Sequence, residues 1–179
     1  MSHQYPQFPG SFVGEGVDDY ILDAPVRAIC AAVGGAIRNS AGIDLYHWRL
    51  FLVYNENTSI VFDMAKNSTE DLQSVPRILR KPYAVTNTAI KVVELPLASA
   101  TLTARKLWEK LYVEGCLQYS YSSSGEGCRA WVSKTICVWE SHGFLAKGAH
   151  ENVLWPVISR VWTDPNHGYP NEMVHGGFH

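Results

Sequence analysis

The chain has 179 residues, of which 46% are hydrophobic and 18% are charged, so it can bury the core of one domain. A formal net charge of −2 leaves neither a basic stripe for nucleic acid nor a polybasic patch for a membrane surface. We therefore expect no nucleic-acid partner.

The first residues, rich in proline, glycine and polar side chains, do not have the charged start and apolar run of a secretory signal. No later apolar run is long enough to span a bilayer. The four cysteines show no CxxC spacing, so we expect free thiols rather than a disulfide framework or a zinc ribbon. We expect a cytoplasmic protein without a membrane span.

Turn-forming residues predict a flexible arm over residues 1–19, a single α+β domain over 20–165 and an irregular tail over 166–179. Residues 26–33 favour a first strand, although their alanines would also suit a helix. Residues 47–65 contain two β-rich runs around the polar turn "NENT", which is typical of a β-hairpin.

After the hairpin, Ser68 is a candidate N-cap followed by acidic residues, which predicts a short helix that ends before Lys81 and Pro82. Residues 89–98 alternate like a strand, and Pro96 indicates an edge strand or a strand end. This antiparallel sheet is expected to pack against the helices that follow it.

Helical spacing of apolar residues predicts a helix over residues 103–115 and a second over 128–143, each ended by glycine. A last helix is predicted over residues 150–162. Cys128 is the first member of the apolar stripe on the second helix.

Cys128 directly follows the glycine-rich turn "SSSGEG" and begins a predicted helix. The unpaired N–H groups and partial positive charge of a helix start lower the pKa of a thiol and make it a better nucleophile. Gly125 and Gly127 carry no side chains, so a carbonyl could approach the sulfur and meet N–H groups that stabilise an oxyanion. The alternative interpretation is that Cys128 is an ordinary buried residue.

His47 lies in a predicted strand, which makes it the predicted base for the Cys128 thiol. Asp63 interrupts the partner strand and is the predicted residue that orients the imidazole. An even turn would place Asp63 on the face opposite His47, whereas an odd loop or a bulge would place both on one face. The alternatives to Asp63 are Asn57, Asn67 and a backbone carbonyl.

The order of these elements resembles the circularly permuted papain-like proteins of the NlpC/P60 and lecithin:retinol acyltransferase-like families, in which the cysteine follows the histidine. The segment "YSYSSSGEGCRAWV" is similar to their cysteine motif and "HWRLFLVY" to their histidine strand, within residues 45–140. Gly127 and Trp131 differ from the asparagine and phenylalanine usual there. The resemblance implies a permuted papain-like core, with Cys128 as nucleophile, His47 as base and Asp63 as the third residue.

The dipeptide His47-Trp48 and the segments at residues 62–64 and 125–131 also resemble an uncharacterised fungal domain family with a "GEGCRxW" helix start. This second resemblance implies a small fungal protein, encoded beside enzymes of secondary metabolism. It implies no particular reaction.

Three functions remain open. The first is a cysteine-dependent hydrolase or acyltransferase for a small apolar or acyl-bearing molecule. The second is a non-covalent cyclase or isomerase with an aromatic pocket, and the third is a non-enzymatic binding module. The predicted substrate-binding residues are Trp48, Tyr119, Tyr121, Arg129 and Trp131.

We expect no cofactor and no metal. The segment "GGAIRNSAG" lacks the GxGxxG spacing of a dinucleotide site, and no glycine-rich loop carries the lysine of a P-loop. The histidines lack the spacing of a known metal-ligand set. The oligomeric state is left open.

Overall fold

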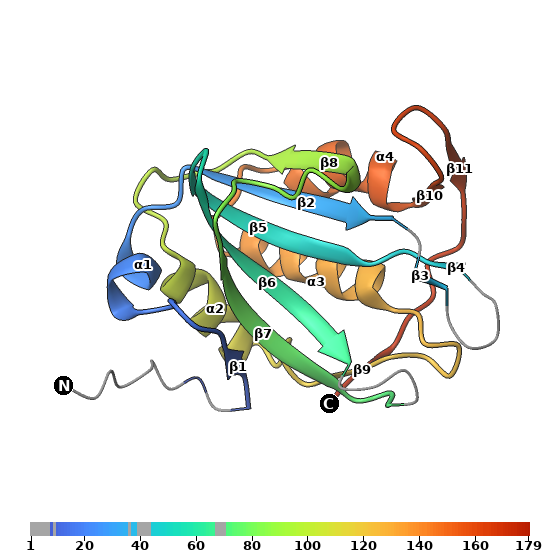
Figure 1. Cartoon of the computed structure of the whole chain (residues 1–179), viewed down its shortest axis with the longest axis horizontal. Helices are drawn as coiled ribbons and strands as arrows, with labels where there is room; N and C mark the ends of the chain where they lie inside the picture. The colour runs from blue at the N-terminus through green and yellow to red at the C-terminus, as the bar shows by residue number, and fades with distance from the viewer. Residues whose placement is uncertain (1–7, 9, 36, 39–43, 67–70) are drawn as a thin grey trace.

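A six-stranded, mostly antiparallel sheet in the order β1-β7-β6-β5-β2-β8 forms one layer of this computed structural model, which describes residues 8, 10–35, 37–38, 44–66 and 71–179. Its strands are β1 (Phe12–Val13), β2 (Ala28–Gly34), β5 (Trp48–Asn55), β6 (Thr58–Lys66), β7 (Ser74–Lys81) and β8 (Ala89–Leu95). Helices α2 (Ala104–Val113) and α3 (Cys128–Ser141) lie behind the sheet in Figure 1. The predicted α+β class with helices packed against a sheet is therefore confirmed.

The remaining elements are short and lie around this two-layer body. The helices are α1 (Asp19–Asp23), the π-helical turn η1 (Ala149–Leu154) and α4 (Trp155–Ile158). The strands form three small pairs: β3 (Ile37–Arg38) with β4 (Asp44–Leu45), β10 (Arg160–Trp162) with β11 (Gly168–Pro170), and β9 (Tyr119–Ser120) with β12 (Gly177–Phe178).

A bulge in the β5–β6 hairpin determines which side chains share a face of the sheet. Val53 pairs with Ser59, but the next pair is Asn55 with Thr58, so the register shifts by one residue near the turn. Leu50 pairs with Phe62 beyond the bulge, and continuing that register sets Arg49 opposite Asp63. The side chain of Asp63 therefore lies on the same face as that of Arg49. Because side chains alternate along a strand, His47, two residues before Arg49, is on this face as well.

The face covered by helices holds the main core. Phe62 of β6 meets Trp108 of α2 edge to face with ring centroids 4.5 Å apart, and it meets Trp139 of α3 at 6.2 Å. The indole N–H of Trp131 donates to the carbonyl of Cys116 at 2.9 Å, which satisfies its polar atom inside the core. These contacts fix α3 against the sheet and thereby fix the position of its first residue, Cys128.

The opposite face of the sheet has a smaller apolar cluster. Cys30, Phe51 and Val61 are buried there, and Tyr83 and Val85 pack against them. Residues 82–88 connect β7 to β8, which lie at opposite sides of the sheet order, so this connection crosses the face (Figure 1).

Most predicted elements match the structure. The strand predicted at residues 26–33, the hairpin, the edge strand at 89–98 and the helices at 103–115 and 128–143 are confirmed. The helix predicted after Ser68 is wrong, because residues 74–81 form β7. In β7 the residues alternate between buried and half-buried side chains, which is the pattern of a strand inside a sheet, while residues 67–70 lie outside the described part.

The predicted last helix is only partly confirmed, because residues 150–162 divide into η1, α4 and β10. The boundaries of the predicted arm and tail stay predictions, although both segments contact the domain. In the arm, β1 pairs in parallel with β7 and Val17 is buried. In the tail, β11 and β12 pair with β10 and β9.

Candidate active site

Cys128 is the first residue of α3, and its sulfur lies 3.3 Å from the carbonyl oxygen of Tyr46, just before β5. The preceding Gly127 has φ +144°, a conformation that favours glycine, and a Cβ at this position would lie only 2.4 Å from the Tyr119 hydroxyl oxygen. Gly127 also supplies no side chain to cap the helix. The N–H groups of the first helical turn therefore remain available to another acceptor.

His47 and Asp63 are directly hydrogen-bonded. His47 lies just before β5, and its Nε2 donates to Asp63 Oδ1 at 2.6 Å. The Nε of Arg49 donates to the other carboxylate oxygen of Asp63 at 3.3 Å. Burial raises the pKa of Asp63, but the hydrogen bonds and charges of His47 and Arg49 outweigh it and hold this pKa below its ordinary value. Asp63 is therefore an ionised carboxylate at neutral pH.

The imidazole of His47 and the sulfur of Cys128 also interact, and each shifts the pKa of the other. Because Nε2 is bound to Asp63, Nδ1 is the nitrogen left for the sulfur. Burial lowers the pKa of His47, but its hydrogen bonds and charge interactions with Asp63 and Cys128 raise it to about 9. His47 thus holds a proton at neutral pH between a carboxylate and a sulfur atom.

The same contacts favour the thiolate form of Cys128. Burial alone would raise the pKa of this thiol, but the hydrogen bond and charge of His47, the backbone N–H of Trp48 and the charge of Arg129 lower it. When protonated, the thiol can donate to the carbonyl of Tyr46, 3.3 Å away. The pair can therefore hold its proton on sulfur or on nitrogen, and its surroundings favour nitrogen.

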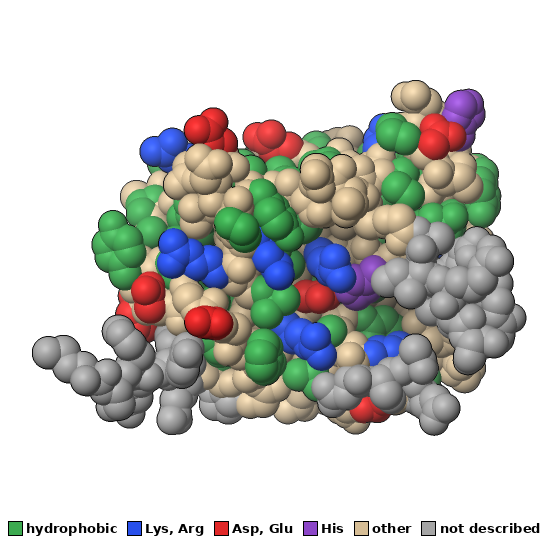
Figure 2. All heavy atoms as spheres, in the orientation of Figure 1, with side chains coloured by type: hydrophobic (Ala, Val, Ile, Leu, Met, Phe, Trp, Pro, Cys, Tyr) green, Lys and Arg blue, Asp and Glu red, His purple; other side chains and the backbone are tan. Residues whose placement is uncertain are grey.

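The structure thus brings together all three predicted catalytic residues, Cys128, His47 and Asp63. The sequence left open whether His47 and Asp63 lie on the same face of the sheet. The bulge in the hairpin places both on one face. Of the predicted alternatives, Asn57 lies in the hairpin turn at the other end of β5, and Asn67 lies outside the described residues. In Figure 2 an imidazole emerges on the face of the sheet toward the viewer, beside acidic and basic side chains.

The predicted substrate-binding aromatics are mostly core residues. Trp48, Tyr119 and Trp131 have at most 1% of their surface exposed, so a substrate cannot contact them in this conformation. Large rings at these positions stabilise the core by burial, and their predicted contact with a substrate stays a prediction. Tyr121 is also buried, and its hydroxyl donates to the carbonyl of Met64.

Arg129 makes structural contacts, and its predicted substrate contact stays a prediction. It is buried, and its guanidinium donates to the carbonyls of Ile158, Asn171 and Glu172 at 3.5, 3.4 and 2.8 Å. Its charge also lowers the pKa of Cys128. Arg129 therefore joins the start of α3 to residues 171–172.

Two residues near the site were not predicted. Arg49 could have been found from its spacing, because it follows His47 by two residues and so shares its face of the strand. Lys66 offers no such signal, since its position depends on the turn before Cys128. Its Nζ lies 4.8 Å from the centre of the Tyr121 ring and next to Gly125.

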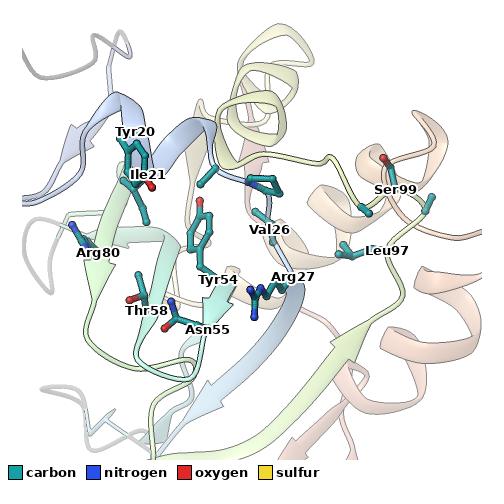
Figure 3. A pocket seen from close by; sticks show the side chains of 14 residues that line it. Tyr20, Ile21, Val26, Arg27, Tyr54, Asn55, Thr58, Arg80, Leu97 and Ser99 are labelled. Carbon is teal, nitrogen blue, oxygen red and sulfur yellow. The ribbon is translucent and has the colours of Figure 1, made fainter.

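A hollow lies at the hairpin-turn end of the sheet, about 25 Å from His47 along β5. It has a volume of about 900 Å³, and Figure 3 shows Arg27 and Arg80 at its sides, with Tyr54 between α1 and the hairpin. The hydroxyl of Tyr54 is buried and has no hydrogen-bond partner among the described residues. The pKa of Tyr54 is raised by burial and by the charge of Asp23.

Two features are absent from the part of the chain that the structure describes. None of its helices combines the length and the apolar character needed to cross a membrane. No group of three or more histidine, cysteine, aspartate and glutamate side chains is arranged there to hold a metal ion.

Residues 28–179 match the family described as a domain of unknown function, DUF7770. The chain belongs to this family. No curated protein and no solved structure matches it. The DUF7770 match begins at the first residue of β2 and includes Cys128, His47 and Asp63, so the whole candidate site lies in the family's domain. It tests neither resemblance stated above, and both stay predictions.

Alkylation by iodoacetamide tests the thiolate in this DUF7770 domain. Between pH 6 and 8 we expect the labelling rate of Cys128 to depend on pH less steeply than that of Cys137, because the interactions with His47, Trp48 and Arg129 lower the pKa of its thiol. Cys137, which is exposed on the same helix and has a raised pKa, should react about tenfold faster for each pH unit. His47→Ala should give Cys128 the same steep dependence. Peptide mass spectrometry measures both rates, and a steep profile for Cys128 in the wild type would contradict the ion pair.

Tyr54→Phe tests the unpartnered hydroxyl. Because the variant removes a buried polar group that makes no hydrogen bond, we expect unchanged stability or a gain of about 1 kcal/mol in the free energy of unfolding. Urea denaturation measures the change, with Tyr112→Phe as the control at an exposed tyrosine. A clear loss of stability for Tyr54→Phe alone would mean that the hydroxyl has a partner.

Proposed function

We propose that this protein is a cysteine-dependent hydrolase or acyltransferase that acts on a small acyl-bearing molecule. The observation that carries the proposal is that one imidazole joins the Asp63 carboxylate to the Cys128 sulfur. These groups come from β6, the residue before β5 and the start of α3, so the fold brings them together from distant parts of the chain. A nucleophile, a base and an orienting group in this order are the components of a catalytic triad.

Acylation begins with the thiolate. The sulfur of Cys128 forms a bond to the acyl carbon, and the electron pair of the carbonyl double bond moves to its oxygen. N–H groups at the start of α3 stabilise this oxyanion. When the carbonyl re-forms, the bond to the leaving group breaks, and Nδ1 of His47 gives its proton to that group.

Deacylation uses the neutral imidazole that remains. His47 takes a proton from water or from an acceptor alcohol or amine as that molecule attacks the thioester carbon. The sulfur then leaves with the electron pair and the thiolate–imidazolium pair returns. Water gives hydrolysis and another acceptor gives acyl transfer, while Asp63 keeps the imidazole oriented throughout.

A permuted papain-like core is the form of the fold that we propose. It is supported by the chain order, in which the histidine strand and its hairpin partner precede the helix that begins with the cysteine. The hydrogen bond between His47 and Asp63, and the interaction of His47 with the Cys128 sulfur, give further support. The differences at Gly127 and Trp131 concern a turn and a core position, and neither removes a group that the chemistry uses.

The two other functions have less support. A non-covalent cyclase or isomerase was predicted from aromatic pocket walls, but Trp48, Tyr119 and Trp131 are buried in the core. A binding module without chemistry would have no use for a carboxylate that raises the pKa of a histidine next to a cysteine. The cysteine mechanism uses all of these features.

Replacing the nucleophile tests the proposal directly. We expect Cys128→Ala and Cys128→Ser to reduce the release of p-nitrophenolate from a series of p-nitrophenyl esters by about 10³-fold or more, because neither retains a thiolate. Cys137→Ala, a change of the same type on the same helix, should keep wild-type activity. Circular dichroism verifies the fold, and a Cys128→Ala variant that still turns over any ester at the wild-type rate would exclude the mechanism.

Asp63→Asn tests the third residue through pH dependence. Asp63 and Cys128 together raise the pKa of His47 to about 9 against the effect of burial, so ester cleavage should decline above that pH as the imidazolium loses its proton. Without the carboxylate charge, the pKa of His47 falls, so the decline should begin at lower pH and the maximum rate should drop by about 10²-fold or more. The pH–rate profile shows both effects. An unshifted alkaline limb would argue against a coupled Asp63.

A further inference from the structure

Residues 171–179, which we name the strap, are hydrogen-bonded to the residue after Cys128 and, through Tyr119, to the residue before it. On one side, Arg129 donates to the carbonyls of Asn171 and Glu172. On the other side, the backbone N–H of Gly176 donates to the hydroxyl of Tyr119 at 2.9 Å, and that hydroxyl donates to the carbonyl of Gly127 at 2.9 Å. The strap is therefore connected to the residues just before and just after the nucleophile.

Several contacts hold the strap near Tyr119. β12 pairs with β9, with Phe178 opposite Tyr119, and the two rings have centroids 4.7 Å apart. The imidazole Nε2 of His179 and the hydroxyl of Ser120 are 2.8 Å apart. Gly176 approaches so closely that a Cβ there would lie 1.9 Å from the carbonyl oxygen of Ser120 and 2.6 Å from the Tyr119 hydroxyl oxygen. This approach admits only glycine.

The hydrogen bond from the Tyr119 hydroxyl to the Gly127 carbonyl also determines where the backbone N–H of Cys128 points. The peptide between Gly127 and Cys128 is planar and trans, so its C=O and N–H point in opposite directions. Gly127 has the unusual φ of +144°, and its carbonyl is held by the Tyr119 hydroxyl and by the backbone N–H of Trp131 at 3.0 Å. Fixing this carbonyl therefore fixes the direction of the Cys128 N–H.

We propose that the strap, acting through Tyr119, orients the backbone N–H of Cys128 as the donor that stabilises the oxyanion. The inference rests on the proposed acyl chemistry and assigns Tyr119 as a positioning residue. Tyr119 is fully buried and does not meet the substrate. Its hydroxyl hydrogen-bonds both to Gly176 and to Gly127, so the position of Gly176 affects the peptide that precedes the nucleophile.

Two reagents separate the direction of the N–H from the reactivity of the thiolate. With iodoacetamide, the sulfur forms a bond to carbon as iodide leaves, and no oxyanion develops. With p-nitrophenyl acetate, the sulfur adds to the carbonyl carbon, the oxygen carries the negative charge, and p-nitrophenolate leaves when the carbonyl re-forms. The ratio of acylation rate to alkylation rate at Cys128 therefore reports oxyanion stabilisation.

The variants are Gly176→Ala, which displaces the strap, and Tyr119→Phe, which removes both hydrogen bonds. Gly177→Ala is the matched control, because the nearest atom to its added Cβ is 3.3 Å away on the His179 side chain. We expect the acylation-to-alkylation ratio to fall about tenfold or more in the first two variants and to stay within about twofold in the control. Tyr119→Phe keeps the test decisive if Gly176→Ala does not fold.

The two failures are distinguishable. An unchanged ratio in a folded Gly176→Ala and in Tyr119→Phe would overturn the role of the strap. An equal fall of both rates, which leaves the ratio unchanged, would mean that the strap supports only the general structure, and it would also overturn the proposal. If wild-type Cys128 reacts with neither reagent faster than Cys137, the proposed function fails as well, before any variant is compared.

Discussion

The candidate site depends on the hydrogen bond between His47 Nε2 and Asp63 Oδ1, 2.6 Å long and mostly buried. An ionised side chain with 6% of its surface exposed needs charged partners, and Asp63 has His47 on one oxygen and Arg49 on the other. The imidazole gains a proton from this arrangement, and its second nitrogen meets the sulfur of Cys128. Burial opposes both the imidazolium and the thiolate, and the contact with the carboxylate outweighs it together with the interactions between His47 and Cys128.

That contact is possible because of a single irregular position in the hairpin. With regular pairing through the turn, every side chain of β6 would lie on the other face relative to β5. The bulge between Val53 and Asn55 shifts the register by one residue and places Asp63 on the face of Arg49. An irregularity about 25 Å from the sulfur thus determines whether a triad can form at all.

The sequence predicted those parts of the molecule that local patterns determine. The hairpin, α2 and α3 follow from periodicity and end signals, and Cys128 with His47 follows from the chemistry that a thiol at a helix start requires. β7 was missed because Ser68 and the acids after it imitate a helix start, while the partners that make residues 74–81 a strand lie on β6 and β1. The burial of Trp48 and Trp131 could not be predicted either, since an aromatic ring has the same sequence signal in a core and in a pocket wall. The strap was expected to be irregular, because it has no periodic pattern and its one strand, β12, has only two residues. The contacts that order the strap come from Tyr119 and Arg129, which are distant in the sequence.

The connectivity of the sheet also has a kinetic consequence. Cys30 pairs with Glu94 and Phe12 with Arg77, so both sides of the sheet close over more than 60 residues of chain, whereas the β5–β6 and β6–β7 pairs join neighbouring segments. Non-local pairs form slowly because the intervening chain must first lose its conformational entropy. His47 and Asp63 belong to the local hairpin, whereas Cys128 reaches them only when α3 docks. During folding, the proton-accepting half of the site can therefore assemble before the sulfur arrives, and the thiol becomes activated only as the tertiary structure closes.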